Sequence, residues 1–373
     1  MLSVEILGGV GEYGRNCFYI ENQRQAILLD CGIMKNTQKT PPNITFNHIE
    51  KLVAVFISHS HIDHVGALPI LQNMGYTGPI LMSHTTAQQL PLLIPQVRTF
   101  YPDTIGKWIE VNEYLAFQWG YSGHLIGSVW YKIRFFEEMI FFSGDYVVDS
   151  YLLKATLPEE DGTVYDVAFI DSGHAEKCIR NLEVLEQMAM YVKAHPNHSF
   201  IFPSSFSGKT VDIMTYLSEH TTRAIRVDAK LQPLLGHYDE EHENIWPNKV
   251  MLLERLKQKQ DSDHVLYFVS EQDVAQVEEL AKDDPTAIFV HTGYSRHAYN
   301  LASLKHISEE FFYKTHPDYW DLVALSQRLR ARQTIYFHST HTNLTTTFPK
   351  EELKRDETKK MGILSVCLGL DND

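Results

Sequence analysis

The sequence predicts an α/β protein in which a sheet-rich part of the chain is interrupted by a second domain built on a parallel sheet. The first observation is a series of short segments rich in β-branched and aromatic residues and bounded by Gly, Asn or Pro, which is typical of strands. These predicted strands are residues 3–7, 17–21, 25–30, 51–58, 79–82, 131–135 and 139–143.

The second observation is that helical and strand patterns alternate from about residue 179. Such alternation is typical of a doubly wound parallel sheet with helices on both faces. The predicted helices are 180–194, 209–219, 249–260 and 272–281, and the predicted strands are 199–203, 223–227, 264–269 and 286–291. After about residue 308 we expect a strand at 311–314, a helix at 319–331, a strand at 334–337 and a solvated helix face at 350–360.

A length of 373 residues suits about two domains, although one long globular unit would also fit. We therefore expect residues 1–175 and 308–373 to form one domain and residues 176–307 to be inserted into it.

The composition is that of an ordinary globular protein, with 44% hydrophobic and 21% charged residues. Because no run approaches the roughly 18 apolar residues of a membrane span and the N-terminus lacks a signal-peptide pattern, we expect a cytoplasmic protein with no membrane partner. The four cysteines form no Cys-x-x-Cys pair, so neither a disulfide framework nor a thiolate zinc site is indicated. The net charge, 33 − 47 = −14, is opposite in sign to that of a typical nucleic-acid binder. Bound divalent cations can nevertheless make the charge of a binding site positive in an acidic protein.

Four metal-capable side chains directly follow the apolar predicted strand 51–58, namely His59, His61, Asp63 and His64. A loop that leaves this strand can aim the first two at one metal and the last two at a second position. Imidazoles with carboxylates suit zinc, and two metals about 3.5–4 Å apart can generate hydroxide and stabilise the attacking and leaving oxygens. The alternative is a polar loop with coincidental histidines.

Two further residues fit this centre. His124 lies in a turn between Gly123 and Gly127, where the backbone can approach a metal closely, and Asp145 ends a second apolar strand and could bridge both metals. Taken alone, they would be a structural histidine and a common turn aspartate. The order and spacing of all these pieces resemble the metallo-β-lactamase superfamily, in which an HxHxDH loop is followed by a His turn and a strand-end Asp.

The rest of the chain resembles one branch of that superfamily, the β-CASP nucleases, which include ribonuclease J and the endonuclease of pre-mRNA 3′-end cleavage. The glycine-rich residues 7–17 look like the start of that family, and Asp171 falls at its first additional acidic motif. Residues 203–209 resemble the segment that opens the inserted domain, and residues 292–294 resemble its Thr-Gly turn. The resemblance implies a metallo-β-lactamase αββα sandwich with an inserted doubly wound parallel-sheet β-CASP domain.

Two histidines near the end complete the resemblance. His316 matches the family's second additional motif, whose histidine protonates the leaving oxygen, and His338 matches the third, whose histidine completes the second metal's ligand set. Alone, they would be a surface residue before a helix and a strand-end residue.

There are also departures from the family. Ser339 and Thr340 stand where it has Gly and Glu, Pro317 follows His316, and Lys209 replaces an Arg. We expect no C-terminal assembly domain of the ribonuclease J kind, and the oligomeric state is open.

The predicted function is RNA phosphodiester hydrolysis by a hydroxide held between two zinc ions, with manganese as an alternative. Asp63 would also act as a base, His316 would donate a proton to the leaving 3′-oxygen, and Asp171 would hold His316 in position. The predicted metal ligands are His59, His61, Asp63, His64, His124, Asp145 and His338. The predicted contacts to a single-stranded RNA partner are Ser205, Lys209, Thr292 and Gly293.

Two other functions stay open. A small-molecule hydrolase of the thioesterase or lactonase type on the same dinuclear scaffold is favoured by the acidic net charge and opposed by the inserted domain and His316. A non-catalytic scaffold is opposed by the intact ligand set. The sequence does not separate RNA from DNA, or internal cleavage from attack at a 5′ end.

Overall fold

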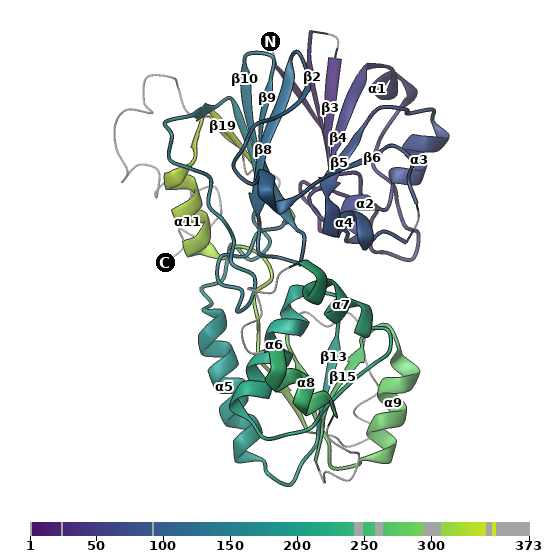
Figure 1. Ribbon diagram of the computed structural model, residues 1–373, viewed down its shortest axis with the longest axis vertical. Helices are drawn as coiled ribbons and strands as arrows, with labels where there is room; N and C mark the ends of the chain where they lie inside the picture. The colour runs from purple at the N-terminus through teal and green to yellow at the C-terminus, as the bar shows by residue number, and fades with distance from the viewer. Residues whose placement is uncertain are drawn as a thin grey trace.

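The computed structural model describes residues 2–23, 25–91, 93–241, 249–257, 264–293, 307–340 and 345–347. Two large sheets form the upper part of the molecule in Figure 1, and a third sheet with its own helices forms the lower part. Among the described helices, none combines the length and apolar character needed to cross a membrane. Cys17, Cys31 and Cys178 are free thiols, and Cys367 lies outside the described residues.

The first sheet has six strands in chain order, antiparallel from β1 to β3 and parallel from β3 to β6. Its strands are β1 (Ser3–Gly8), β2 (Cys17–Asn22), β3 (Gln25–Leu29), β4 (Leu52–Phe56), β5 (Ile80–Ser83) and β6 (Val97–Phe100). Short helices pack their apolar residues on its outer face: α1 (Phe46–Lys51), α3 (Leu68–Asn73) and α4 (His84–Gln88).

The second sheet has seven strands in the order β20-β19-β12-β10-β9-β8-β7. These are β20 (Thr345–Thr347), β19 (Gln333–Phe337), β12 (Val167–Asp171), β10 (Glu138–Phe142), β9 (Val129–Phe135), β8 (Leu115–Tyr121) and β7 (Ile109–Asn112). Helix α11 (Tyr319–Arg328) covers its outer face through Leu322 and Leu325.

Aromatic side chains fill the space between the two sheets. Phe56 of the first sheet meets Phe117 and Tyr131 of the second, with ring centroids 5.5 and 5.3 Å apart. Along β9 the side chains alternate, so that Tyr131 and Ile133 enter this core while Trp130 packs on the outer side. Two sheets face to face with helices outside are the predicted αββα sandwich, which is confirmed.

The third sheet has five parallel strands in the order β14-β15-β13-β16-β17. They are β14 (Ile225–Val227), β15 (Leu266–Ser270), β13 (Phe200–Ser204), β16 (Ile288–His291) and β17 (Ser308–Glu310). Phe200 and Phe202 of β13 face one helical layer, and Ile201 faces the opposite layer. The first layer is α5 (Asn181–Ala194), α6 (Gly208–His220), α7 (Gln232–Glu241) and α8 (Lys249–Lys257), and the second is α9 (Val274–Asp283). The doubly wound parallel sheet is therefore confirmed.

Some predicted elements are wrong. The predicted strand at 311–314 has no regular structure, because Tyr313 and Lys314 turn into polar networks instead of a sheet. The last strand of the third sheet is β17, just before it. The predicted helix 319–331 ends at Arg328, since Arg330–Ala331 (β18) pairs with Val164–Tyr165 (β11). Residues 350–360 lie outside the described residues.

Asp212 of α6 fastens the third sheet's helices to the rest of the chain. Its buried carboxylate accepts hydrogen bonds from the backbone N–H groups of Tyr151 and Leu152, both at 3.0 Å, and from Ser150 Oγ at 2.7 Å. The Tyr313 hydroxyl donates a further bond at 2.6 Å. One side chain thus joins α6 to the loop that follows β10 and to the segment that returns from β17.

Candidate metal centre and catalytic site

Metal-capable side chains gather where strands of both large sheets end. β3 to β6 run parallel, and so do β10, β12 and β19, so each group of strands directs its carboxyl ends to one edge of its sheet. Beyond these ends lie His59 after β4, Asp145 after β10, Asp171 at the end of β12 and His338 after β19. The short helix α2 (Ile62–Val65) carries Asp63 and His64 and has His61 at its N-cap; His124 lies between β8 and β9, and His316 precedes α11.

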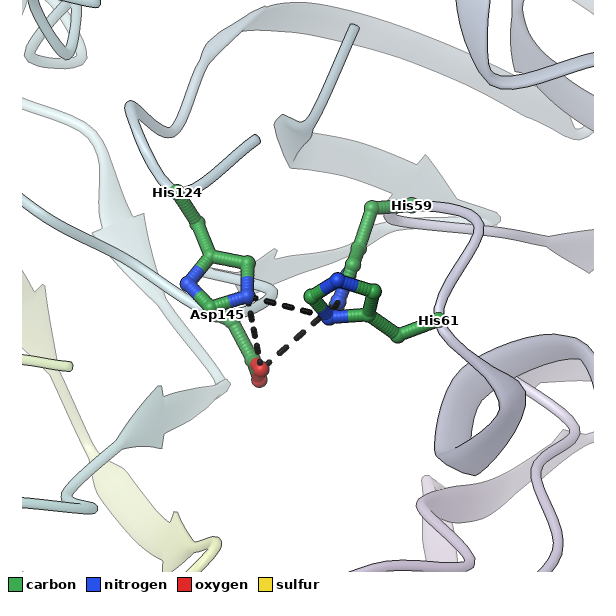
Figure 2. Close-up of side chains that lie close together, drawn as sticks. All are labelled: His59, His61, His124 and Asp145. Carbon is green, nitrogen blue, oxygen red and sulfur yellow. Dashed lines mark hydrogen bonds and ion pairs between the residues drawn. The ribbon is translucent and has the colours of Figure 1, made fainter. Parts of the chain in front are cut away.

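Four of these residues form the first cluster: His59, His61, His124 and Asp145 (Figure 2). His61 Nδ1 lies 3.0 Å from His59 Nε2 and 3.2 Å from His124 Nε2. Asp145 Oδ2 is 3.7 Å from His59 Nε2 and 3.6 Å from His124 Nε2. Burial lowers the pKa of His59 and reduces the pKa values of His61 and His124 to about 3. The imidazoles are therefore neutral, which is the form that binds metal.

The remaining nitrogens of these rings are held by hydrogen bonds. His61 Nε2 donates to the carbonyl oxygen of Phe206 at 2.9 Å, and His124 Nδ1 donates to that of Thr315 at 2.7 Å. His59 Nδ1 lies 3.0 Å from Ser58 Oγ. Because each ring is fixed on its far side, the nitrogen that faces the cluster keeps its lone pair for a cation.

The second cluster is formed by Asp63, His64 and His338. His338 Nε2 lies 3.5 Å from Asp63 Oδ2. Asp145 lies between the two clusters, with Oδ1 3.3 Å from His64 Nε2 and Oδ2 3.9 Å from His338 Nε2. This position suits a carboxylate that bridges two ions.

The donor set fits a metal. Although it is buried, Asp145 Oδ1 accepts no hydrogen bond from the part of the chain that the structure describes. Nδ1 of His61 also lies against Nε2 of His59 and Nε2 of His124, and because the rings are neutral, no added proton bridges these three nitrogens. A bound cation would satisfy both features, and nitrogen with carboxylate oxygen is the ligand set typical of zinc.

Three neighbours of the second cluster were not predicted from the sequence. Asp30 Oδ2 accepts a hydrogen bond from His64 Nδ1 at 2.6 Å, Asn16 Nδ2 lies 3.0 Å from His64 Nε2, and Lys35 Nζ lies 2.7 Å from Asp63 Oδ1. Asp30 lies at the carboxyl end of an apolar strand, as Asp145 and Asp171 do, and this pattern would have predicted it. Asn16 and Lys35 lie in loops, where no local pattern marks them.

His316 and Asp171 form a pair beside the clusters. His316 Nδ1 donates to Asp171 Oδ2 at 2.9 Å, and Asp171 also accepts from the N–H groups of Tyr146 and Gly173 at 3.0 and 2.9 Å. A Cβ on Gly173 would lie 2.6 Å from the Cγ of His316, so only glycine admits the ring here. Burial lowers the pKa of His316 to about 3, and His338 acts in the same direction. Burial and Asp145 raise the pKa of Asp171.

The predicted substrate contacts lie at the carboxyl ends of strands of the third sheet. Ser205 and Lys209 follow β13, and Thr292 and Gly293 follow β16. Lys209 Nζ donates to the Thr292 carbonyl at 3.3 Å and approaches Gly293, while Ser205 Oγ lies 3.0 Å from Ser207 Oγ. Since neighbouring Phe206 contacts His61, this end of the sheet faces the metal centre.

Comparison with known proteins shows similarity over part or most of the chain. Residues 10–103, which include His59, His61, Asp63 and His64, match the model of the metallo-beta-lactamase superfamily. A solved structure, a protein of unknown function from Enterococcus faecalis V583, shares the fold over 91% of this chain and 94% of its own, with a TM-score of 0.62 and 14% identity.

Curated relatives match shorter stretches. Integrator complex subunit 11 of Danio rerio is 29% identical over 39% of this chain and 29% of its own length. Cleavage and polyadenylation specificity factor subunit 3-II of Arabidopsis thaliana is 24% identical over 58% of this chain and 41% of its own length. Transcription termination factor FttA of Methanothermobacter thermautotrophicus is 24% identical over 59% and 40%.

The chain thus spans less than half the length of the curated relatives it matches. The resemblance predicted from the sequence is nevertheless confirmed: residues 10–103 match the metallo-beta-lactamase superfamily, and the chain is similar to Integrator complex subunit 11, cleavage and polyadenylation specificity factor subunit 3-II and transcription termination factor FttA.

Proposed function

We propose that the chain is a dinuclear metal-dependent hydrolase that cleaves phosphodiester bonds in RNA. The observation that carries the proposal is the pairing of two metal-capable clusters, with Asp145 of the first close to His64 and His338 of the second, and with the His316–Asp171 pair beside them. The names of the relatives point the same way, since they concern transcript cleavage and polyadenylation and the termination of transcription. Single-stranded RNA is the expected substrate.

Each cluster would hold one divalent ion, zinc in the first instance and manganese as the alternative. The first ion would bind His59, His61, His124 and Asp145, and the second would bind Asp63, His64, His338 and the other oxygen of Asp145. When bound, such ions lower the pKa of water toward about 7 and neutralise charge that develops on phosphate oxygens. Asp63 would orient the attacking water and accept its proton at a carboxylate oxygen.

His316 would donate the proton that the leaving 3′-oxygen requires. Its Nδ1 is occupied by Asp171, so Nε2 is the nitrogen that faces a substrate. The imidazole is neutral in the free protein because burial lowers its pKa. A phosphodiester anion placed beside the ring would raise this pKa, so His316 would take up a proton as substrate binds. Asp171 acts by holding the ring in this orientation.

The third sheet would position the rest of the substrate. Lys209, whose pKa is lowered by burial, and the Thr292–Gly293 turn would contact phosphates, with Ser205 beside them. The inserted domain would begin at residue 176, as predicted. We propose that it ends at Glu310 and not at residue 307, because β17 pairs with β16.

The test is cleavage of 5′-labelled and internally labelled single-stranded RNA and DNA by zinc- or manganese-loaded protein. Wild type is compared with Asp63→Asn, His316→Ala and a control, His84→Ala, whose ring stacks on Tyr101 instead of facing the clusters. We expect cleavage that is lost in the first two variants and kept in the control, with product lengths separating internal from terminal attack. Hydrolysis of thioester or lactone substrates by loaded protein that leaves both polymers intact would support the small-molecule hydrolase instead.

A further inference from the structure

The two clusters differ in which protein groups lie next to their metal-capable side chains. In the first cluster, the facing nitrogens of His59, His61 and His124 meet one another and Asp145. In the second, other side chains of the protein already lie against two of the three residues. Lys35 Nζ lies 2.7 Å from Asp63 Oδ1, and Asn16 Nδ2 lies 3.0 Å from His64 Nε2.

The backbone around Lys35 and Asn16 is fixed against α2, which carries Asp63 and His64. The N–H groups of Asn16 and Cys31 donate to the carbonyl oxygens of Asp63 and His64, both at 2.8 Å. A Cβ on Gly32 would lie 1.6 Å from the carbonyl oxygen of Asp63, so the loop that leads to Lys35 lies directly on this helix. The contact between Lys35 and Asp63 therefore follows from how the two segments pack.

The ammonium of Lys35 changes the electrostatics of the second cluster. The Asp63 side chain is 2% exposed and that of Lys35 is 37% exposed, so the pair is at the edge of a buried site where screening by water is incomplete. A cation that binds Asp63 must share this carboxylate with Lys35 or displace the ammonium, and it meets a like charge in either case.

We propose that Lys35 makes the second cluster the weaker metal site, so that an ion fills the first cluster before the second. Asn16 adds to the difference, since an ion at His64 Nε2 would displace its amide. The proposal rests on the proposed metal-dependent function, and it deepens that function by making occupancy of the second site the step that limits activity as the free metal concentration falls.

The experiment is a zinc titration of the full chain after removal of metal with a chelator, followed by calorimetry in the presence of a competing chelator and by metal analysis. Asp63→Asn and His124→Ala assign the binding steps, because each removes a ligand from one cluster. Wild type is then compared with Lys35→Met and Lys35→Gln. The matched control is Lys39→Met, at an exposed lysine of the same loop.

We expect two steps in wild type, the second at least tenfold weaker and lost in Asp63→Asn. Both Lys35 variants should bind the second ion about tenfold or more tightly with the first step unchanged, and Lys39→Met should match wild type. If wild type binds two ions and the Lys35 variants leave the second step unchanged or weaker, the role of Lys35 is wrong while the metal centre stands. If folded wild type binds no zinc and no manganese, the proposed function itself fails.

Discussion

The Nε2–H group of His61 donates a hydrogen bond of 2.9 Å to the carbonyl oxygen of Phe206. A side chain of the first cluster, in the sandwich, is thereby held by the segment that leads from β13 into α6. The bond from His124 Nδ1 to the Thr315 carbonyl, in the segment that returns to the sandwich, has the same effect. The geometry of the metal centre therefore depends on how the third sheet's domain is docked.

Gly208 allows this docking, and we expect Gly208→Ala to damage the metal centre. A Cβ at this position would lie 2.6 Å from the carbonyl oxygen of His124, so α6 would have to move away from the cluster. Loss of the bonds that orient a ligand typically costs about 10–100-fold in metal affinity. Zinc binding and RNA cleavage should fall together while circular dichroism stays unchanged. Gly236→Ala is the control, because a Cβ there meets nothing within 4 Å; equal effects in both variants would contradict the docking argument.

Asp171 and His316 should behave as one unit. We expect His316→Ala to lower kcat by about 10²-fold or more, the range for a general acid, and Asp171→Asn to lower kcat less with KM nearly unchanged. Asp171→Asn should add little in the His316→Ala background, since a positioning residue acts through the ring that it holds. Single-turnover kinetics of the four proteins measure this, with exposed Asp103→Asn as control. Fully additive losses would show that Asp171 has a role independent of His316.

Much of the metal centre could be predicted because strand ends mark it in the sequence. His59, Asp145, Asp171 and His338 each follow or end an apolar strand, and parallel strands bring their carboxyl ends together whatever the loop lengths. The wrong strand at 311–314 shows where this reasoning fails. Its aromatic residues suggest a strand, but Tyr313 instead donates to a buried carboxylate of α6, a contact between residues 101 apart in sequence.

The contacts of Lys35 and Asn16 could not be predicted for a related reason. Each contact forms because a loop packs against α2. Neither loop has a hydrophobic periodicity or a motif spacing that would predict this packing. The hydrogen bond from His61 is accepted by the backbone carbonyl of Phe206. Every residue has such a carbonyl, so no side-chain pattern in the sequence predicts this bond.

Asp30 should matter for metal binding although it does not face an ion. Its Oδ2 accepts from His64 Nδ1 at 2.6 Å, which leaves His64 Nε2 as the nitrogen that would bind a metal, and Oδ1 accepts from the N–H of Ser58 at 2.7 Å. We expect Asp30→Asn to weaken binding of the second ion by about 10–100-fold, because an amide nitrogen turned toward His64 would favour the other tautomer. Titration with zinc checks this, and an effect confined to the first ion would contradict the assignment of His64 to the second cluster.

Asp212 should contribute to stability instead of chemistry. Burial raises the pKa of its carboxyl group, so ionisation costs some stability, but four donors converge on it. In Asp212→Asn the amide NH₂ would face N–H and O–H donors that need an acceptor, and a buried donor left without a partner costs about 1–3 kcal/mol. We expect the free energy of unfolding of the metal-free protein to fall by about 2–3 kcal/mol in denaturant titrations.

The control for this variant is Asp283→Asn, at an exposed aspartate near the end of α9. Because Asp212 joins α6 to the loop after β10 and to the segment after β17, its loss should also loosen the docking that holds His61 and His124. Zinc affinity should therefore fall in Asp212→Asn and stay unchanged in Asp283→Asn. A destabilised Asp212→Asn protein with wild-type zinc affinity would show that the two domains stay docked without this carboxylate.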